Sequence, residues 1–229
     1  MRRALRSDLL ALPLEAAPRL LGAELRTSVG GDDVHLRITE VEAYHGQGTG
    51  ETPDPGSHAR MGRTARNATM WGEPGHLYVY LSHGIHSCVN VVCGPEGTAG
   101  GVLLRAGEVV HGVEVAARRR GVSPPLGGVA LRDLARGPGR FGQASGLRHP
   151  LHDGVDAVGG SPWHGASAEL WLTDHPVTDI ASGPRVGVAG LAGTEAFPWR
   201  FWISGDPTVS AFRWGRGARD ASAASPVLD

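Results

Sequence analysis

Alternating polar and apolar positions predict strands in the first half of the chain. Four segments show this alternation: residues 23–29, 34–42, 76–81 and 85–92. The first two are joined by Gly30-Gly31-Asp32-Asp33, and the second two meet at a short His83-Gly84 tip. Glycine-containing turns between alternating segments are typical of β-hairpins, so we expect two hairpins here.

Helical periods and shorter strands fill most of the remaining chain. We expect helices over residues 9–21, over residues 108–120, and in the glycine-rich GPGRFGQASGL segment within residues 134–147. The first is interrupted by Pro13 and Pro18 and ended by Gly22. Short strands are expected at 102–104, 170–172, 185–188 and 200–203. Residues 45–75 are expected to form a long turn-rich loop, and loops of this length in a compact domain more often have a function than not. Residues 218–229 are expected to be a mobile tail.

Length and composition favour one domain. The 229 residues are 41% apolar, which is enough for a sizeable core, and the chain shows neither a repeat nor a domain boundary. Residues 1–229 are therefore predicted to form a single domain. No stretch reaches the roughly 18 consecutive apolar residues of a membrane span, and the N-terminus lacks the apolar region of a signal peptide. We expect no membrane association and a cytoplasmic location, at the nucleoid in a bacterium.

The two cysteines, Cys88 and Cys93, lie in the short segment SCVNVVC. On a strand they point to opposite faces, where a disulfide is difficult to form. A zinc site needs two further ligands at suitable spacing, and no CxxC or HxxxH pattern supplies them. We expect buried free thiols, a reducing compartment and no metal.

The charge pattern changes the picture in two ways. All 22 basic residues are arginine, which excludes mechanisms that need a lysine amine, such as Schiff-base catalysis or a P-loop lysine. The net charge is only −1, yet residues 57–148 carry 11 arginines against five acids, a balance of +6. A face that binds phosphate is one interpretation, and a solvated surface with chance clustering is the other.

The strand VHLRITEVE places carboxylates on a face that begins apolar. Val34, Leu36, Ile38, Glu40 and Glu42 share that face, and the two glutamates lie about 7 Å apart along the strand. Such a pair could serve acid/base catalysis, or one carboxylate could orient the other. An edge strand whose solvent end has turned polar is the alternative. The tyrosine and histidine that follow in EAYHG favour a functional site.

Six blocks of sequence carry a resemblance to a known family. In order, the chain contains ITEVEAYHG, GSHARMGRTARNATMW, PGHLYVYLSHGIHSCVNV, GVLLRAGE, GPGRFGQA and PRVGV. Over residues 20–210 it closely resembles the alkyladenine (3-methyladenine) DNA glycosylases of animal type. The resemblance implies a single mixed α/β domain around a curved antiparallel sheet, with a protruding hairpin that enters the DNA minor groove. It also implies a monomer that acts on double-stranded DNA containing alkylated or deaminated purines, without a cofactor.

The same resemblance assigns roles to individual residues. Glu42 corresponds to the general base that activates water, and Arg105 to the arginine that helps to hold the water and the flipped nucleotide. Tyr44, His58 and Tyr80 correspond to the aromatic box around the flipped base. Asn90 corresponds to the asparagine that clashes with the 2-amino group of guanine. The remaining matched positions are the DNA wedge and its surroundings, at His83, Ile85, Met70 and Trp71, and two contacts to the DNA backbone, at Arg66 and Arg140.

Three positions depart from the pattern of the family. His83 stands where the wedge is usually a tyrosine, and His86 replaces an aromatic residue of the same hairpin. Imidazole is the weaker stacking group, so we expect weaker base flipping, or help from Ile85 or Met70. Arg140 replaces a lysine, an exchange that preserves a contact to phosphate.

The leading hypothesis is a glycosylase that removes alkylated purines from DNA. Two alternatives remain open: a non-catalytic binder of damaged DNA on the same fold, and a hydrolase of free nucleosides. Because the chain has no lysine, and its α-amino group lies far in sequence from every matched block, we expect an intact abasic site as product and no lyase activity.

Overall fold

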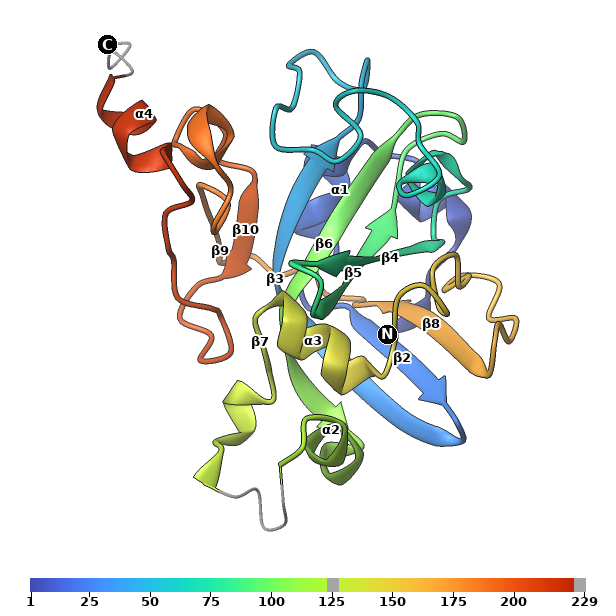
Figure 1. Ribbon diagram of the computed structural model, residues 1–229. Helices are drawn as coiled ribbons and strands as arrows, with labels where there is room; N and C mark the ends of the chain where they lie inside the picture. Colours follow the sequence, from blue (N-terminus) through green and yellow to red (C-terminus); the bar gives the residue numbers. More distant parts are fainter. Residues whose placement is uncertain (123–127, 225–229) are drawn as a thin grey trace.

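The strand β3 (Asp32–His45) organises the fold, since three other strands pair with it. The computed structural model describes residues 1–122 and 128–224, which form a mixed α/β fold around an antiparallel sheet that does not close into a barrel (Figure 1). The other strands are β1 (Arg2–Arg3), β2 (Glu24–Val29), β4 (Leu77–Ser82), β5 (His86–Val92), β6 (Gly100–His111), β7 (Ala135–Arg136), β8 (Ala166–Leu172), β9 (Ile180–Gly183) and β10 (Arg200–Ile203).

The α-helices are short, and most of them pack on the sheet. They are α1 (Pro13–Arg19), α2 (Val113–Arg119), α3 (Pro138–Ser145) and α4 (Ala218–Ala224). Helix α1 packs on β3 and β6, and α3 packs on β5 and β6. Phe141 of α3, together with leucines and valines from the strands, closes one large buried apolar cluster. This arrangement confirms the predicted fold class.

The sheet branches at β3. Its main path runs β1-β8-β2-β3-β6-β5-β4, and β10 pairs with β3 at Glu40–Glu42, beyond the part of β3 that pairs with β2. The pairing of β3 with β6 is irregular between Ile38 and Val41. Bulges of this kind bend a strand and redirect its side chains, often beside active sites. The two glutamates predicted to share a face therefore lie at the branch of the sheet.

Both predicted hairpins are confirmed. Strands β2 and β3 turn at Gly30-Gly31, and β4 and β5 turn at His83-Gly84. The φ angles of His83 and Gly84 are 50° and 74°, so both residues are left-handed within the three-residue loop 83–85 that joins the paired residues Ser82 and His86. Glycine adopts this left-handed conformation readily, whereas histidine does so less often. The turn therefore presents the His83 side chain at the tip of the hairpin.

Some expected boundaries are wrong. Residues 108–111 continue strand β6, and the helix starts only at Val113, because Gly112 has a left-handed φ of 75° that breaks the chain direction. The first α-helix begins at Pro13, since a proline fits the first turn, where its missing N–H is not needed. Residues 185–188 form a turn and not a strand.

The C-terminal part of the chain differs from the expected mobile tail. Residues 218–224, expected to belong to a mobile tail, form helix α4, while residues 225–229 of that tail lie outside the described residues. Cys88 and Cys93 are free and buried, as predicted. None of the helices in the described ranges is long and apolar enough to cross a membrane.

Candidate active site

One cleft brings together most of the side chains that the sequence singles out. It has a volume of about 1090 Å³ and is lined by the β4–β5 hairpin, by the start of α3, and by residues 186–189 and 213–214 of the C-terminal part. Nine of the predicted site residues line it: Glu42, Tyr44, His58, Met70, Tyr80, His83, Asn90, Arg105 and Arg140. Ile85 and Arg66 do not.

Glu42 has both carboxylate oxygens held inside this cleft, with only 1% of the residue exposed. Its Oε1 accepts a hydrogen bond from the backbone N–H of Val186 at 2.7 Å, and its Oε2 accepts one from the hydroxyl of Tyr44 at 2.8 Å. These two bonds fix the plane of the carboxylate. Oε2 keeps a second lone pair, so the group can still accept a proton from a bound water.

A second buried carboxylate, Glu40, positions Arg105. The Nε of Arg105 lies 3.0 Å from Oε1 of Glu40 and 3.1 Å from the Ser210 hydroxyl, while its Nη1 lies 3.4 Å from Oε1 of Glu42. Arg200 adds a further charge, with its Nε 2.6 Å from Oε1 of Glu40. Burial alone disfavours the charged guanidinium, but Glu42 and Glu40 outweigh it and raise the pKa of Arg105. Glu40 holds Arg105, and Arg105 contacts Glu42. The geometry therefore favours an orienting role for Glu40 over a pair of equivalent acids.

The predicted aromatic box is open toward the cleft. The rings of His58 and Tyr80 meet edge to face with centroids 4.5 Å apart, and Tyr78 stacks on Tyr80 at 5.5 Å. Burial, reinforced by Arg66 and Arg60, lowers the pKa of His58, so its imidazole is neutral at neutral pH. Burial also raises the pKa of Tyr80 and raises that of Tyr78 to about 12. The box therefore presents neutral rings.

A buried ion pair lies against the ring of Tyr44, and the sequence did not predict it. The guanidinium of Arg185 lies 4.5 Å from the centroid of the Tyr44 ring and makes a bidentate pair with Asp54, at 2.7 and 2.8 Å. Arg185 is fully buried and also donates to the carbonyls of Ala43 and Ala192. The pair thus joins β3, the loop that leads to His58, and the segment that holds Glu42. The sequence signal was the matched block PRVGV, in which no role was assigned to the arginine.

Asn90 and Met70 also line the cleft. The side-chain amide of Asn90 donates to the carbonyl of Tyr78 at 3.0 Å, which fixes its orientation across the β4–β5 pair. Met70 is buried among Ala59, Tyr78 and neighbouring apolar groups and lines the cleft from below. Of the wedge residues, only His83 and Ile85 lie on the exposed hairpin tip, where Ile85 is 70% exposed.

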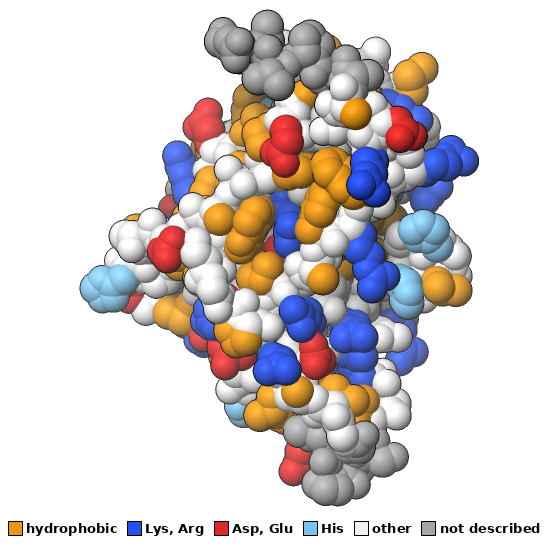
Figure 2. All heavy atoms as spheres, turned by 90° about the vertical axis from the view of Figure 1, so that its left-hand side faces the viewer, with side chains coloured by type: hydrophobic (Ala, Val, Ile, Leu, Met, Phe, Trp, Pro, Cys, Tyr) orange, Lys and Arg blue, Asp and Glu red, His pale blue; other side chains and the backbone are white. Residues whose placement is uncertain are grey.

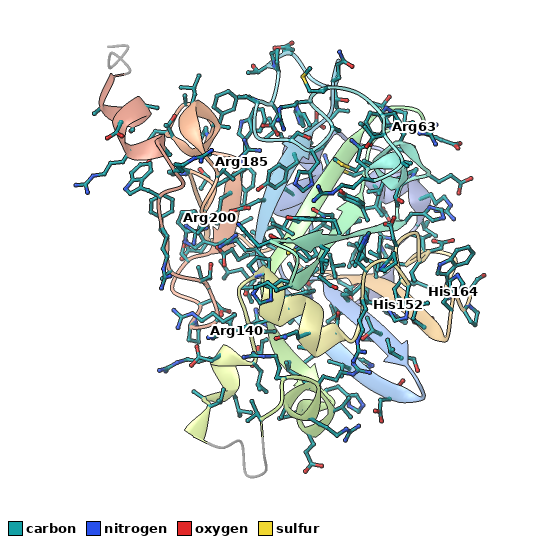
Figure 3. All side chains as sticks on the ribbon, viewed as in Figure 1. Arg63, Arg140, His152, His164, Arg185 and Arg200 are labelled. Carbon is teal, nitrogen blue, oxygen red and sulfur yellow. The ribbon has the colours of Figure 1, made fainter. Side chains whose placement is uncertain are left out.

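The basic middle of the sequence does not become one free basic face. Arg118 pairs with Asp32, while Arg119 and Arg120 donate to backbone carbonyls. The cleft instead draws its positive charge from several segments, among them helix α3, whose Arg140 is labelled in Figure 3. Six arginines and one carboxylate, Glu42, are found among the described residues that line it: Arg60, Arg105, Arg120, Arg136, Arg140 and Arg213. Within the described residues, no cluster of histidine, cysteine or acidic side chains could hold a metal ion.

The cleft combines aromatic rings, which can stack on a nucleobase, with arginines, which can bind phosphate. These are the features of an enzyme that processes nucleic acids. Comparison with known proteins narrows the class. The family model of methylpurine-DNA glycosylase matches residues 8–207. The chain belongs to this family, which places it among the DNA glycosylases, hydrolases of DNA repair.

Bacterial relatives match almost the whole chain. A protein of Leifsonia xyli named "Putative 3-methyladenine DNA glycosylase" is 49% identical over 209 residues, which covers 91% of this chain and 92% of the relative. Relatives of the same name in Nocardia farcinica and Streptomyces avermitilis are 49% and 46% identical, over 90% and 93% of this chain and the same shares of theirs.

Proposed function

We propose that the protein flips an alkylated purine out of duplex DNA into this cleft and hydrolyses its N-glycosidic bond. The observation that carries this proposal is Glu42, a buried carboxylate whose plane is fixed by two hydrogen bonds and which lines an open cleft together with aromatic rings and arginines. A general base must be held within hydrogen-bonding reach of its water, and this geometry supports that role.

The reaction builds positive charge on the sugar as the bond to the base breaks. A carboxylate stabilises such an oxocarbenium-like state and removes a proton from the attacking water. Arg105, tied to Glu40 and close to Glu42, supplies donors beside the water and the flipped nucleotide. The leaving purine of 3-methyladenine type is already cationic, so it needs little help from an acid.

The aromatic box accounts for preference among bases. Neutral rings of Tyr44, His58 and Tyr80 favour a flat cationic base by about 0.5–2 kcal/mol each. To the amide of Asn90, which the Tyr78 carbonyl holds, we assign the exclusion of the 2-amino group of guanine. Extrusion of the base costs a few kcal/mol, and the His83 side chain at the hairpin tip offsets part of it by entering the gap in the DNA.

The product is an abasic site that the enzyme leaves uncut. The chain has no lysine to attack the sugar. Its α-amino group forms an ion pair with Asp174, after the end of β8, and Met1 does not line the cleft. Borohydride trapping of the pure protein on lesion DNA is expected to give no covalent adduct, and a trapped adduct would contradict this part of the proposal.

The test is single-turnover base release from duplexes that each carry one lesion. Substitution Glu42→Gln, which preserves shape, is expected to lower the rate about 100- to 10,000-fold. Unchanged release would remove Glu42 as the base. A wild-type protein that binds lesion duplex without releasing base would be a binder on the same fold. Release from free nucleosides with little salt dependence would indicate a nucleosidase instead.

A further inference from the structure

Two exposed aromatic side chains stand beside the active-site cleft, in a segment that the family match does not reach. Phe212 and Trp214 are 36% and 40% exposed, and Arg213 and Trp214 line the same cleft as Glu42. The match to the family ends at residue 207. From residue 211 to 219 the sequence reads AFRWGRGAR, which combines aromatic residues with three arginines and contains no acid.

The backbone that carries Trp214 is fixed. The carbonyl of Arg213 accepts a hydrogen bond from the N–H of Gly187 at 2.9 Å, and the carbonyl of Arg216 accepts one from Gly190 at 3.0 Å. Between them, Gly215 approaches Val188 so closely that a Cβ at this position would lie 2.0 Å from the Val188 carbonyl oxygen. The chain therefore holds an exposed indole on an ordered support instead of a loose tail.

Phe212 braces this indole from the side. The two rings meet edge to face with centroids 4.9 Å apart and an angle of 82° between their planes. Exposed aromatic pairs on an ordered backbone mark binding surfaces more often than isolated surface hydrophobics do. On the face that carries the C-terminal segment, hydrophobic and arginine side chains lie side by side (Figure 2).

The support of Trp214 is continuous with that of the catalytic carboxylate. The N–H of Val186 holds Oε1 of Glu42, and the next residue, Gly187, holds the carbonyl of Arg213. Arg213 is exposed and makes no ion pair with the described residues. A polyanion that enters the cleft to reach Glu42 therefore passes a ring for stacking and a free guanidinium for a phosphate, which are the two contacts used to bind unpaired nucleotides.

We propose that Trp214 is a stacking surface for the nucleotide of the lesion strand next to the flipped purine, and that Arg213 binds a phosphate of the same strand. This inference rests on the proposed function. It also gives the chain an aromatic contact to DNA that does not depend on the hairpin tip, where His83 offers only a small ring.

The test measures the affinity for a lesion duplex in the Glu42→Gln background, so that no base is released during the titration. Adding Trp214→Ala is expected to weaken binding about tenfold or more without changing its salt dependence, and Trp214→Phe to restore most of the affinity. Adding Arg213→Gln is expected to reduce the slope of log K against log salt by about 0.9.

Trp163 supplies the matched control. It is 48% exposed, does not line the cleft, and lies next to His164, which Figure 3 shows on the side of the molecule away from Arg185 and Arg200. Trp163→Ala is expected to leave the affinity unchanged. Equal affinity of the Trp214→Ala and parent proteins would overturn the proposal, as would an equal loss in Trp163→Ala. Base release by the wild-type protein, measured first, separates this failure from failure of the proposed function.

Discussion

The substitution Asp54→Asn removes one charge from the buried pair behind Tyr44 while preserving its shape. Asp54 accepts two hydrogen bonds from Arg185, at 2.7 and 2.8 Å, and two from the backbone N–H groups of Gly56 and His45. An asparagine offers one oxygen to these four donors, and its amide hydrogens face the guanidinium. An arginine does not lose its proton in a protein. In the Asp54→Asn variant, Arg185 therefore stays charged and buried with no carboxylate paired to it.

Breaking a buried pair by removing one partner costs about 3–5 kcal/mol. The free energy of unfolding of an ordinary domain is about 5–15 kcal/mol, so Asp54→Asn is expected to remove about a fifth of it or more. The rings of Tyr44 and Trp199, 4.5 and 5.1 Å from the guanidinium, keep the loss near the lower end of this range. Urea unfolding followed by circular dichroism measures it.

Glu15→Gln is the matched control, the same carboxylate-to-amide change in an exposed pair with Arg19 at 4.0 Å. It is expected to cost about 0.5 kcal/mol or less. The double substitution Asp54→Leu with Arg185→Met removes both charges and is expected to recover much of the stability lost in Asp54→Asn. A loss below about 1 kcal/mol in Asp54→Asn would refute the reasoning, since a buried guanidinium would then tolerate having no counter-ion.

Three further predictions concern the reaction. His83→Tyr places a larger stacking ring at the hairpin tip and is expected to tighten binding to lesion duplex, measured by titration in the Glu42→Gln background. Asn90→Ala removes the group proposed to exclude guanine and is expected to raise the release of unmodified guanine relative to alkylated purines, measured on matched duplexes. Burial lowers the pKa of His58, so the imidazole takes up a proton in the folded protein only at acidic pH, below the ordinary pKa of histidine. That proton adds a cation beside a cationic base and costs stability, since the unfolded chain takes it up more readily. Release of 7-methylguanine is expected to fall in that range, and the fall should be absent in His58→Gln.

Local sequence predicted the hairpins well and some of the boundaries poorly. The alternation in residues 34–42 and the turns at Gly30-Gly31 and His83-Gly84 are short-range signals, and the structure confirms them. The sequence predicts a helix from residue 108 onward, whereas pairing with β3 keeps residues 108–111 in β6. Cross-strand pairing is a long-range contact, and it overrides local preference.

Residues 185–188 show the same limit for the site. Their alternation predicted a strand, but Arg185 is buried because Asp54, 131 residues away, binds it, and Val186 is placed to donate to Glu42, 144 residues away. No local period encodes either partner. The sequence blocks contain the side chains proposed for the chemistry, whereas the groups that orient them come from distant parts of the chain.

The positions of the arginines also depend on contacts between distant segments. Counting along the sequence located the positive charge in residues 57–148, yet three consecutive arginines there, Arg118 to Arg120, are used to hold the fold. Arg213, from the acidic flank, lines the cleft with no ion-pair partner among the described residues. A surface that binds DNA depends on which guanidinium groups remain unpaired after folding, and pairing is decided by contacts between distant segments. Five of the six arginines that line the cleft come from residues 57–148, so the balance of +6 has the sign expected for a DNA partner, but the count does not tell which arginines stay unpaired.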